Sequence, residues 1–131
     1  MKYLIDTHIF IWFVENLPNL RQTARKLIEN NKSEIFISIA SLWEISIKTS
    51  IGKLQMNRKF EDIVDVLSEN SIEILPITFA HTLENNQLPF NHRDPFDRII
   101  ISQAIIENMD FISSDVIFDK YLKGKSVKRI S

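Results

Sequence analysis

Four acidic residues stand at positions from which their carboxylates could gather around divalent cations: Asp6, Glu44, Asp97 and Asp115. Asp6 and Asp115 each follow a short apolar run, and the other two stand near the starts of apolar, helix-like segments. Carboxylates that meet at one place repel one another unless their pKa values rise or cations bind among them. A set of oxygen ligands in a chain without cysteine favours Mg²⁺ or Mn²⁺ over zinc. We therefore predict a Mg²⁺ or Mn²⁺ site built from these four side chains.

Such a site suits phosphate chemistry. One bound ion can lower the pKa of a water molecule enough to make hydroxide, and a second ion roughly 4 Å away can stabilise the leaving oxygen. No nucleophile from the protein is then required. The sequence thus predicts hydrolysis of phosphodiester bonds by metal-activated water, with activity lost in excess chelator.

The elements that must position these acids alternate along the chain. Short aliphatic and aromatic runs predict strands at residues 2–6, 34–38, 72–75, 111–113 and 127–130. Helices are predicted between them at residues 9–14 and 20–28, from Ser38 or Ser41 to Gly52, at 60–67 and 79–83, from Asp94 onward, and at 116–122. A loop is expected over residues 87–93.

This βαβα alternation predicts a three-layer α/β/α fold with a mainly parallel central sheet, formed by residues 1–131 as a single domain. Ligands of such sheets bind beyond the carboxyl ends of the strands. Asp6 and Asp115 follow strands at that edge, and the helices that carry Glu44 and Asp97 leave from it. We therefore expect the four acids to converge there.

Composition limits the classes of function. The chain has 131 residues, 44% of them hydrophobic and 25% charged, which is ordinary for a soluble protein. The absence of cysteine removes disulfides and thiol nucleophiles and suits a reducing cytoplasm. No apolar stretch approaches a membrane span, so we expect no membrane partner. The net charge of −1 and the pI of about 6.3 argue against binding a polyanion by bulk electrostatics.

Four segments carry a family resemblance: Leu-Ile-Asp-Thr-His at 4–8, Ala-Ser-Leu-Trp-Glu-Ile at 40–45, His-Arg-Asp-Pro-Phe-Asp-Arg at 92–98 and Ser-Ser-Asp at 113–115. In their order and spacing the chain resembles the PIN-domain ribonucleases, specifically the VapC-type toxins of bacterial type II toxin–antitoxin systems. The resemblance implies a Mg²⁺- or Mn²⁺-dependent endoribonuclease with catalytic acids at Asp6, Glu44, Asp97 and Asp115. It also implies a homodimer and an antitoxin that sends a basic side chain into the acidic pocket.

The same acids also have structural interpretations, because carboxylates near helix N-termini interact favourably with free amides. Asp94 belongs to the family's Asp-Pro-Phe-Asp pattern but also fits a helix cap, with Asp97 as an acidic partner in that cap. Ser41 and Glu44 match a capping box, and Asp115 could cap the helix that begins at Val116. Asp6 is the hardest of the acids to explain structurally, because a carboxylate at the end of a buried strand needs a partner or an ion.

Polar neighbours of the acids have two interpretations each. Thr7 and Ser114 either orient a carboxylate or a bound water, or bond to the local backbone. Arg98 and Arg93 either hold phosphate oxygens or pair with an aspartate. His8 is either a general base or, as we favour, a hydrogen-bonding residue.

Two further basic features are weaker candidates. His81 and His92 are less favoured than His8 for catalysis. The basic tail either tracks a nucleic-acid backbone or is a solvated surface, the interpretation that such runs usually support. It comprises Lys120, Lys123, Lys125, Lys128 and Arg129.

Three other functions compete with the nuclease. A phosphorylatable receiver domain needs an acid pair after the first strand and a lysine near Asp115, and both are missing. A phosphatase of the Asp-x-Asp type fails because His8 occupies the second acidic position. The remaining alternative is a non-catalytic protein-binding module, in which Trp12, Phe13 and Trp43 dock a partner helix and the acids are structural caps.

Overall fold

A five-stranded parallel sheet forms the centre of the molecule. The computed structural model describes residues 1–90 and 94–131. The strands run in the order β3-β2-β1-β4-β5, and each neighbouring pair is parallel. Their bounds are β1 Lys2–Ile5, β2 Glu34–Ser38, β3 Ile72–Leu75, β4 Asp110–Ile112 and β5 Arg129–Ile130. The predicted α/β class with a parallel sheet is confirmed.

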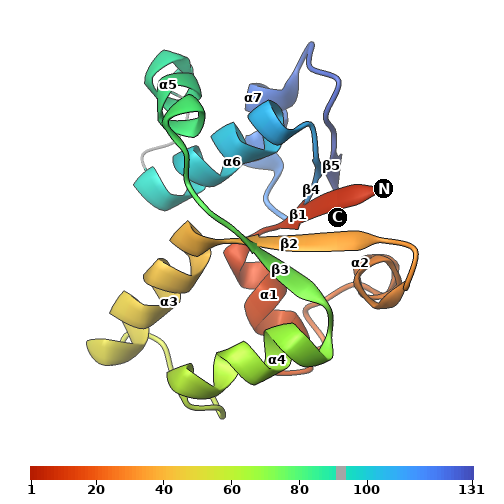
Figure 1. Ribbon diagram of the computed structural model, residues 1–131, viewed down its shortest axis with the longest axis vertical. Coiled ribbons are helices and arrows are strands. Elements are labelled where there is room, and N and C mark those ends of the chain that lie inside the picture. Colours follow the sequence, from red (N-terminus) through yellow and green to blue (C-terminus); the bar gives the residue numbers. More distant parts are fainter. Residues whose placement is uncertain (91–93) are drawn as a thin grey trace.

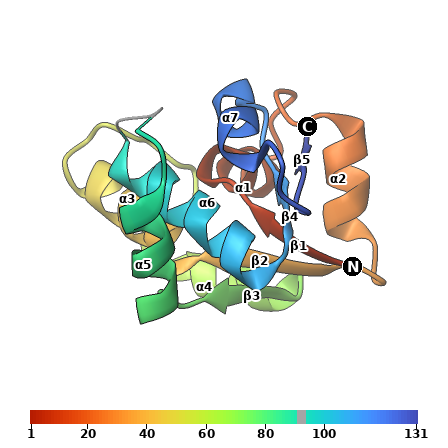
Figure 2. The ribbon, with the colours of Figure 1, turned by 90° about the horizontal axis from the view of Figure 1, so that it is seen from above.

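Helices cover both faces of this sheet and complete the three layers (Figure 1). In Figure 1, α5, α6 and α7 lie above the sheet, and α1 and α4 lie below it; Figure 2 shows the same arrangement from above. None of the described helices is long and apolar enough to cross a membrane. The bounds are α1 Thr7–Val14, α2 Gln22–Glu29, α3 Ile39–Ser50, α4 Ile63–Glu69, α5 Phe79–Gln87, α6 Pro95–Glu107 and α7 Asp119–Leu122, with 3₁₀ turns at η1 Phe60–Asp62 and η2 Val116–Phe118.

Two hydrophobic cores separate the layers, because successive strand residues point to opposite faces. In β1, Tyr3 and Ile5 pack with residues of α1, α2 and α4 in one core. Leu4 packs in the other core with residues of α6 and α7. Leu4 and Ile5 are both fully buried, which identifies β1 as the central strand. Burial on both faces explains the continuous apolar runs in the sequence.

The order of the strands in the sheet has a switch point between β1 and β4. The chain builds β1, β2 and β3 outward on one side, then crosses over to add β4 and β5 on the other. Open α/β sheets bind ligands at such a switch point, beyond the carboxyl ends of the strands. The Asp6 amide bonds to the Ile112 carbonyl at 2.9 Å, which joins the ends of β1 and β4.

The helix α3, which carries Glu44, begins and ends with specific caps. The Ser38 hydroxyl accepts the Ala40 amide at 3.0 Å, so Ser38, one of the two expected starts, is the N-cap. The helix ends with the Lys53 amide bonded to the Lys48 carbonyl and the Gly52 amide bonded to the Thr49 carbonyl. Gly52 has φ +75°, the left-handed conformation that this ending requires.

Differences from the predicted elements are small. The helix α5 runs to Gln87 rather than Leu83, because the Arg98 guanidinium donates to the Asn85 carbonyl near its end. The strand β5 begins at Arg129 rather than at residue 127, since the preceding Lys128 amide bonds to the Asp110 carboxylate. Part of the predicted loop, residues 91–93, lies outside the described residues.

We expect Ser38→Ala to lower the free energy of unfolding by about 1 kcal/mol, because the Ala40 amide loses its partner at the start of α3. Urea unfolding measures this loss. Ser46→Ala in the same helix is the matched control and should cost nothing, since alanine is the better helix former. Equal losses in the two variants would contradict the assigned cap.

Candidate active site

Asp6 lies at the end of the central strand and is buried, with 3% of its surface exposed. The Ser113 hydroxyl donates to Asp6 Oδ2 at 2.7 Å, and the Asp115 amide donates to the Ser113 hydroxyl oxygen at 3.1 Å. This chain of hydrogen bonds links the ends of β1 and β4 at the switch point. The side chain of Ser113 therefore connects the region of Asp115 to Asp6.

The charge of Asp6 is destabilised in the folded protein. Burial raises the pKa of the Asp6 carboxyl above its ordinary value of 3.8, and the nearby Glu44 carboxylate raises it further. The Ser113 hydrogen bond, the His8 side chain and the Thr7 amide act in the opposite direction, but the net shift is upward. Asp6 and Glu44 are thus close enough to repel each other.

Glu44 is the second buried carboxylate of the site, with 3% of its surface exposed. It lies in the second turn of α3, one turn later than the sequence suggested, because the helix begins at Ile39. The Lys48 ammonium, one turn further on, donates to Glu44 Oε2 at 2.7 Å. The other oxygen, Oε1, is buried and has no hydrogen-bond partner among the described residues. This oxygen is available to a ligand.

Asp94 and Asp97 lie at the start of α6. Asp94 is the N-cap, and its carboxylate accepts the amides of Phe96 and Asp97 at 2.9 and 3.4 Å. The Phe96 ring packs edge-on against Trp43 of α3, with ring centroids 5.4 Å apart. Hydrogen bonding to Glu44 raises the pKa of Lys48, and the charges of Asp94 and Asp97 add to this effect. Lys48 is therefore close enough to the acids of both helices to interact with them electrostatically.

Asp115 follows β4 and caps the 3₁₀ turn η2, where its Oδ1 accepts the Ile117 amide at 3.0 Å. The prediction that Asp115 caps the turn beginning at Val116 is therefore confirmed. The residue is exposed, and one carboxylate oxygen is not used by that bond. A cap of this kind leaves Asp115 able to serve as a ligand too.

The donor chemistry fits a hard divalent cation at Asp6 and Glu44. Two buried carboxylates, one with a raised pKa and one with an unpaired oxygen, make an excess of negative charge that a cation would compensate. Within residues 1–90 and 94–131, however, no three acidic or histidine side chains stand close enough together to hold an ion. The participation of Asp97 and Asp115 as ligands thus remains a prediction.

The polar neighbours make bonds that the sequence did not suggest. The Thr7 hydroxyl donates to the Ser41 hydroxyl at 2.8 Å, which ties α1 to α3. Ser41 therefore takes no part in a capping box with Glu44, because α3 starts three residues earlier. The Arg98 guanidinium donates to the Pro89 carbonyl at 2.9 Å as well as to the end of α5. Ser114 is exposed beside Asp115.

Two residues of the site were missed by sequence analysis. Ser113, rather than Ser114, supplies the hydroxyl that reaches Asp6. The strand ends at Ile112, so only the residue directly after it shares the buried face of Asp6. Lys48 could have been found from its spacing, since a lysine four residues after a glutamate is the favourable order for a helical ion pair.

The histidines and Arg93 considered as alternatives have three different outcomes. His8 is exposed and close enough to Asp6 to affect its pKa. His81 is fully buried: its Nδ1 accepts the Thr78 amide, and its Nε2 lies 2.7 Å from Glu107 Oε2. It therefore has a structural use in α5. His92 and Arg93 lie outside the described residues.

The aromatic residues proposed for a binding module do not share one surface. Phe13 is buried in a core, Trp12 packs partly against the same core, and Trp43 is 61% exposed on α3. In the basic tail, Arg129 forms two hydrogen bonds with the Asp119 carboxylate at 2.9 and 3.2 Å and one with the Ser113 carbonyl. The four lysines of the tail are exposed.

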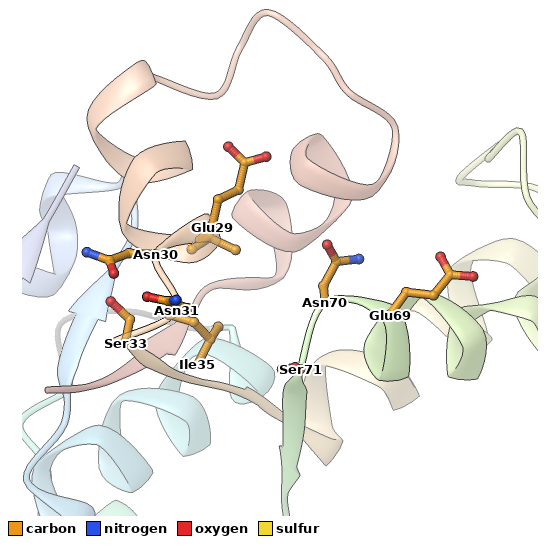
Figure 3. A pocket seen from close by; sticks show the side chains of 9 residues that line it. Glu29, Asn30, Asn31, Ser33, Ile35, Glu69, Asn70 and Ser71 are labelled. Carbon is orange, nitrogen blue, oxygen red and sulfur yellow. The ribbon is translucent and has the colours of Figure 1, made fainter.

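One hollow of about 330 Å³ adjoins the site, and Glu44 and Lys48 form part of its lining. A second hollow, of about 290 Å³, lies at the opposite edge of the sheet, near the starts of β2 and β3 (Figure 3). The carboxylates of Glu29 and Glu69 in its lining are well separated and do not converge. This second hollow contains none of the candidate acids. The first hollow is lined by Glu44 and therefore belongs to the candidate site.

The comparison with protein families decides the identity of the fold. The model of the PIN domain matches residues 3–123. The chain belongs to the PIN-domain family. The matched range includes every candidate acid of this PIN domain, from Asp6 to Asp115. Comparison with curated proteins gave no match.

Solved structures similar to this PIN domain share its fold over almost their whole length. A chain of VapBC2 from Rickettsia felis, bound to a promoter DNA fragment, has a TM-score of 0.73 and 19% identity, with 99% of this chain and 98% of that one covered. DNA-bound VapBC from Salmonella typhimurium has a TM-score of 0.71 and 14% identity, with 99% of this chain and 97% of that one covered. A chain of a toxin–antitoxin complex from Klebsiella pneumoniae has a TM-score of 0.65 and 17% identity, with 98% of this chain and 96% of that one covered.

Asp6→Asn should stabilise the metal-free protein at neutral pH. Because the folded pKa of Asp6 is raised, the folded state holds this proton more tightly than the unfolded chain, and its contribution to stability falls as the pH rises above 3.8. Asp6→Asn lacks this loss of stability. The free energy of unfolding of the variant should therefore exceed that of the wild type by an amount that grows with pH. Urea unfolding in chelator, from about pH 4 to pH 8, measures the difference.

Asp119→Asn is the control for this experiment, because its effect on stability at neutral pH should have the opposite sign. Arg129 lowers the pKa of Asp119, so this carboxylate adds stability above pH 3.8 that is lost as the pH falls through the lowered value. The Asp119 variant should therefore lose stability at neutral pH. A loss of stability in Asp6→Asn at neutral pH would contradict the raised pKa.

Lys48→Met should lower the free energy of unfolding by about 1–3 kcal/mol, because it leaves the buried Glu44 carboxylate without its cation. The double variant Glu44→Gln/Lys48→Met should recover most of that loss, since the unpaired charge is removed. Denaturant unfolding in chelator compares them. Lys26→Met, at an exposed position of α2, should change stability by less than about 0.5 kcal/mol. An unchanged stability of Lys48→Met would show that the ion pair is unimportant.

Proposed function

We propose that this PIN domain is a metal-dependent endoribonuclease of the VapC type, the toxin of a toxin–antitoxin pair acting in the cytoplasm. The observation that carries the proposal is the pair of buried carboxylates, Asp6 and Glu44, at the switch point of the sheet. One has its pKa raised by burial, and the other keeps a buried oxygen without a partner. Buried carboxylates with a perturbed pKa cluster at functional sites.

Asp6, Glu44, Asp97 and Asp115 would hold Mg²⁺ or Mn²⁺ and are the proposed catalytic residues. The cation would supply an activated water and stabilise the charge that develops on the phosphate. Asp6 has its orientation fixed by Ser113, and Glu44 is held by its helix and by Lys48. Asp94 keeps the first turn of α6 in shape, which determines where Asp97 points.

The structural neighbours support a cognate antitoxin as a partner. One solved relative is described as a toxin–antitoxin complex and two others as VapBC bound to DNA. We propose by analogy that a cognate antitoxin binds this chain, that the chain forms a homodimer, and that its substrate is RNA. The acidic pocket would attract a basic side chain of an antitoxin electrostatically.

The test is cleavage of structured and single-stranded RNA and DNA by the purified protein in Mg²⁺ or Mn²⁺, free of bound antitoxin. We expect RNA cleavage that is lost in excess chelator and falls at least about a hundredfold in Asp6→Asn and Asp97→Asn, because each removes one negative ligand. Asp110→Asn, at the other end of β4, is the matched control and should keep its activity.

Wild-type activity in Asp6→Asn, or cleavage that persists in chelator, would overturn the proposed mechanism. Cleavage of DNA in preference to RNA would correct the substrate. A folded, antitoxin-free protein that cuts nothing with either metal would favour the non-catalytic binding module instead.

A further inference from the structure

The hollow beside the candidate acids has features that catalysis by the carboxylates does not require. It measures about 330 Å³, at the lower end of the range of roughly 300–1,000 Å³ in which small ligands bind. One wall is α1, with His8 and Trp12; the second is α3, with Glu44 and Lys48; the third is the segment after α3, with Lys53. Aromatic, cationic and acidic groups therefore meet in one cavity.

The aromatic wall is rigid. His8 and Trp12 are one helical turn apart, with ring centroids at 6.0 Å and planes inclined by 35°. Trp12 packs partly against the hydrophobic core, which fixes its ring, while the rest of its surface lines the cavity. An indole held in this way is a surface on which a nucleotide base can stack, whatever its sequence.

The cationic wall is also held by the fold. Lys48 is fixed by its bond to Glu44, and the left-handed turn at Gly52 bonds the Lys53 amide to the Lys48 carbonyl. Both ammonium groups belong to residues that line the hollow. Their charge is complementary to phosphate. Of the two acidic groups of the lining, Glu44 pairs with Lys48 and Glu15 accepts the Asn57 amide at 2.7 Å.

We propose that this cavity binds one unpaired nucleotide of the RNA, with its base against Trp12 and His8 and its phosphate near Lys48 and Lys53. The inference rests on the proposed nuclease function, since Glu44 lines the same cavity and a cation held by the acids would bind the neighbouring phosphodiester. A base in a duplex is stacked and paired, so it cannot reach the indole. The cavity would therefore select single-stranded segments for cleavage.

The chain offers a direct test because it has two tryptophans, one in the cavity and one outside it. In an Asp97→Asn background with Mg²⁺, Trp43→Phe leaves Trp12 as the fluorophore, and Trp12→Phe leaves Trp43. A single-stranded RNA oligonucleotide should quench Trp12 more strongly than Trp43, and a duplex of the same sequence should leave Trp12 unquenched. Equal quenching of the two residues, or equal quenching by the duplex, would overturn the proposal.

Binding and cleavage by variants give the second readout. Trp12→Leu should weaken binding of the oligonucleotide by about ten- to a hundredfold, the usual effect of losing one stacked base. Lys53→Ala should weaken binding and lower the slope of log affinity against log salt by about one. Lys123→Ala, an exposed lysine of the tail, is the matched control and should leave both quantities unchanged. Urea unfolding checks that each variant is folded.

The outcomes separate this proposal from the nuclease itself. RNA cleavage by the wild type with normal binding by Trp12→Leu and Lys53→Ala would overturn the nucleotide site and leave the nuclease standing. Quenching of Trp12 by single-stranded RNA without any cleavage would support the site and contradict the nuclease. Variants that bind RNA normally but lose an antitoxin would assign the cavity to a protein partner and overturn the proposal.

Discussion

The burial of two carboxylates is the constraint on which the rest of the site depends. Asp6 and Glu44 each expose 3% of their surface, and burial, with a smaller contribution from the Glu44 charge, raises the pKa of Asp6. An unpaired charge in a protein interior is costly, so nearby groups must offset it. The Ser113 hydroxyl does so for Asp6 and the Lys48 ammonium for Glu44. The excess that remains is what makes this edge of the sheet suitable for a cation.

The parallel sheet brings these groups to one edge without special loops. Because β1 and β4 are neighbours, the residues that follow them meet, and Ser113 can reach Asp6 across the gap. The helix α3 leaves the adjacent strand β2 through the Ser38 cap and carries Glu44 to the same edge. The Thr7–Ser41 hydrogen bond then fixes α1 against α3. Short-range capping and strand order together position the acids.

Sequence alone predicted the order of strands and helices because burial on both faces leaves continuous apolar runs, as at residues 34–38. It also predicted Asp94 as a cap, since Asp-Pro is a local signal for a helix start. It could not identify Ser113 as the partner of Asp6, because that contact joins residues 107 positions apart. Trp43 illustrates the same limit: this tryptophan of an apolar helix is 61% exposed, and its ring packs edge-on against Phe96 of α6, a contact between residues far apart in the sequence.

Apart from Asp6 and Asp115, which follow strands, the candidate site has two halves carried by different helices. Glu44 and Lys48 belong to α3 and move together, whereas Asp94 and Asp97 belong to α6. Between the halves, the rings of Trp43 and Phe96 meet edge to face at 5.4 Å, and Trp43 is largely open to solvent. The spacing of the acids is thus set by a seam that reaches the molecular surface. A change at this one aromatic contact would alter the separation of the two halves without touching any carboxylate.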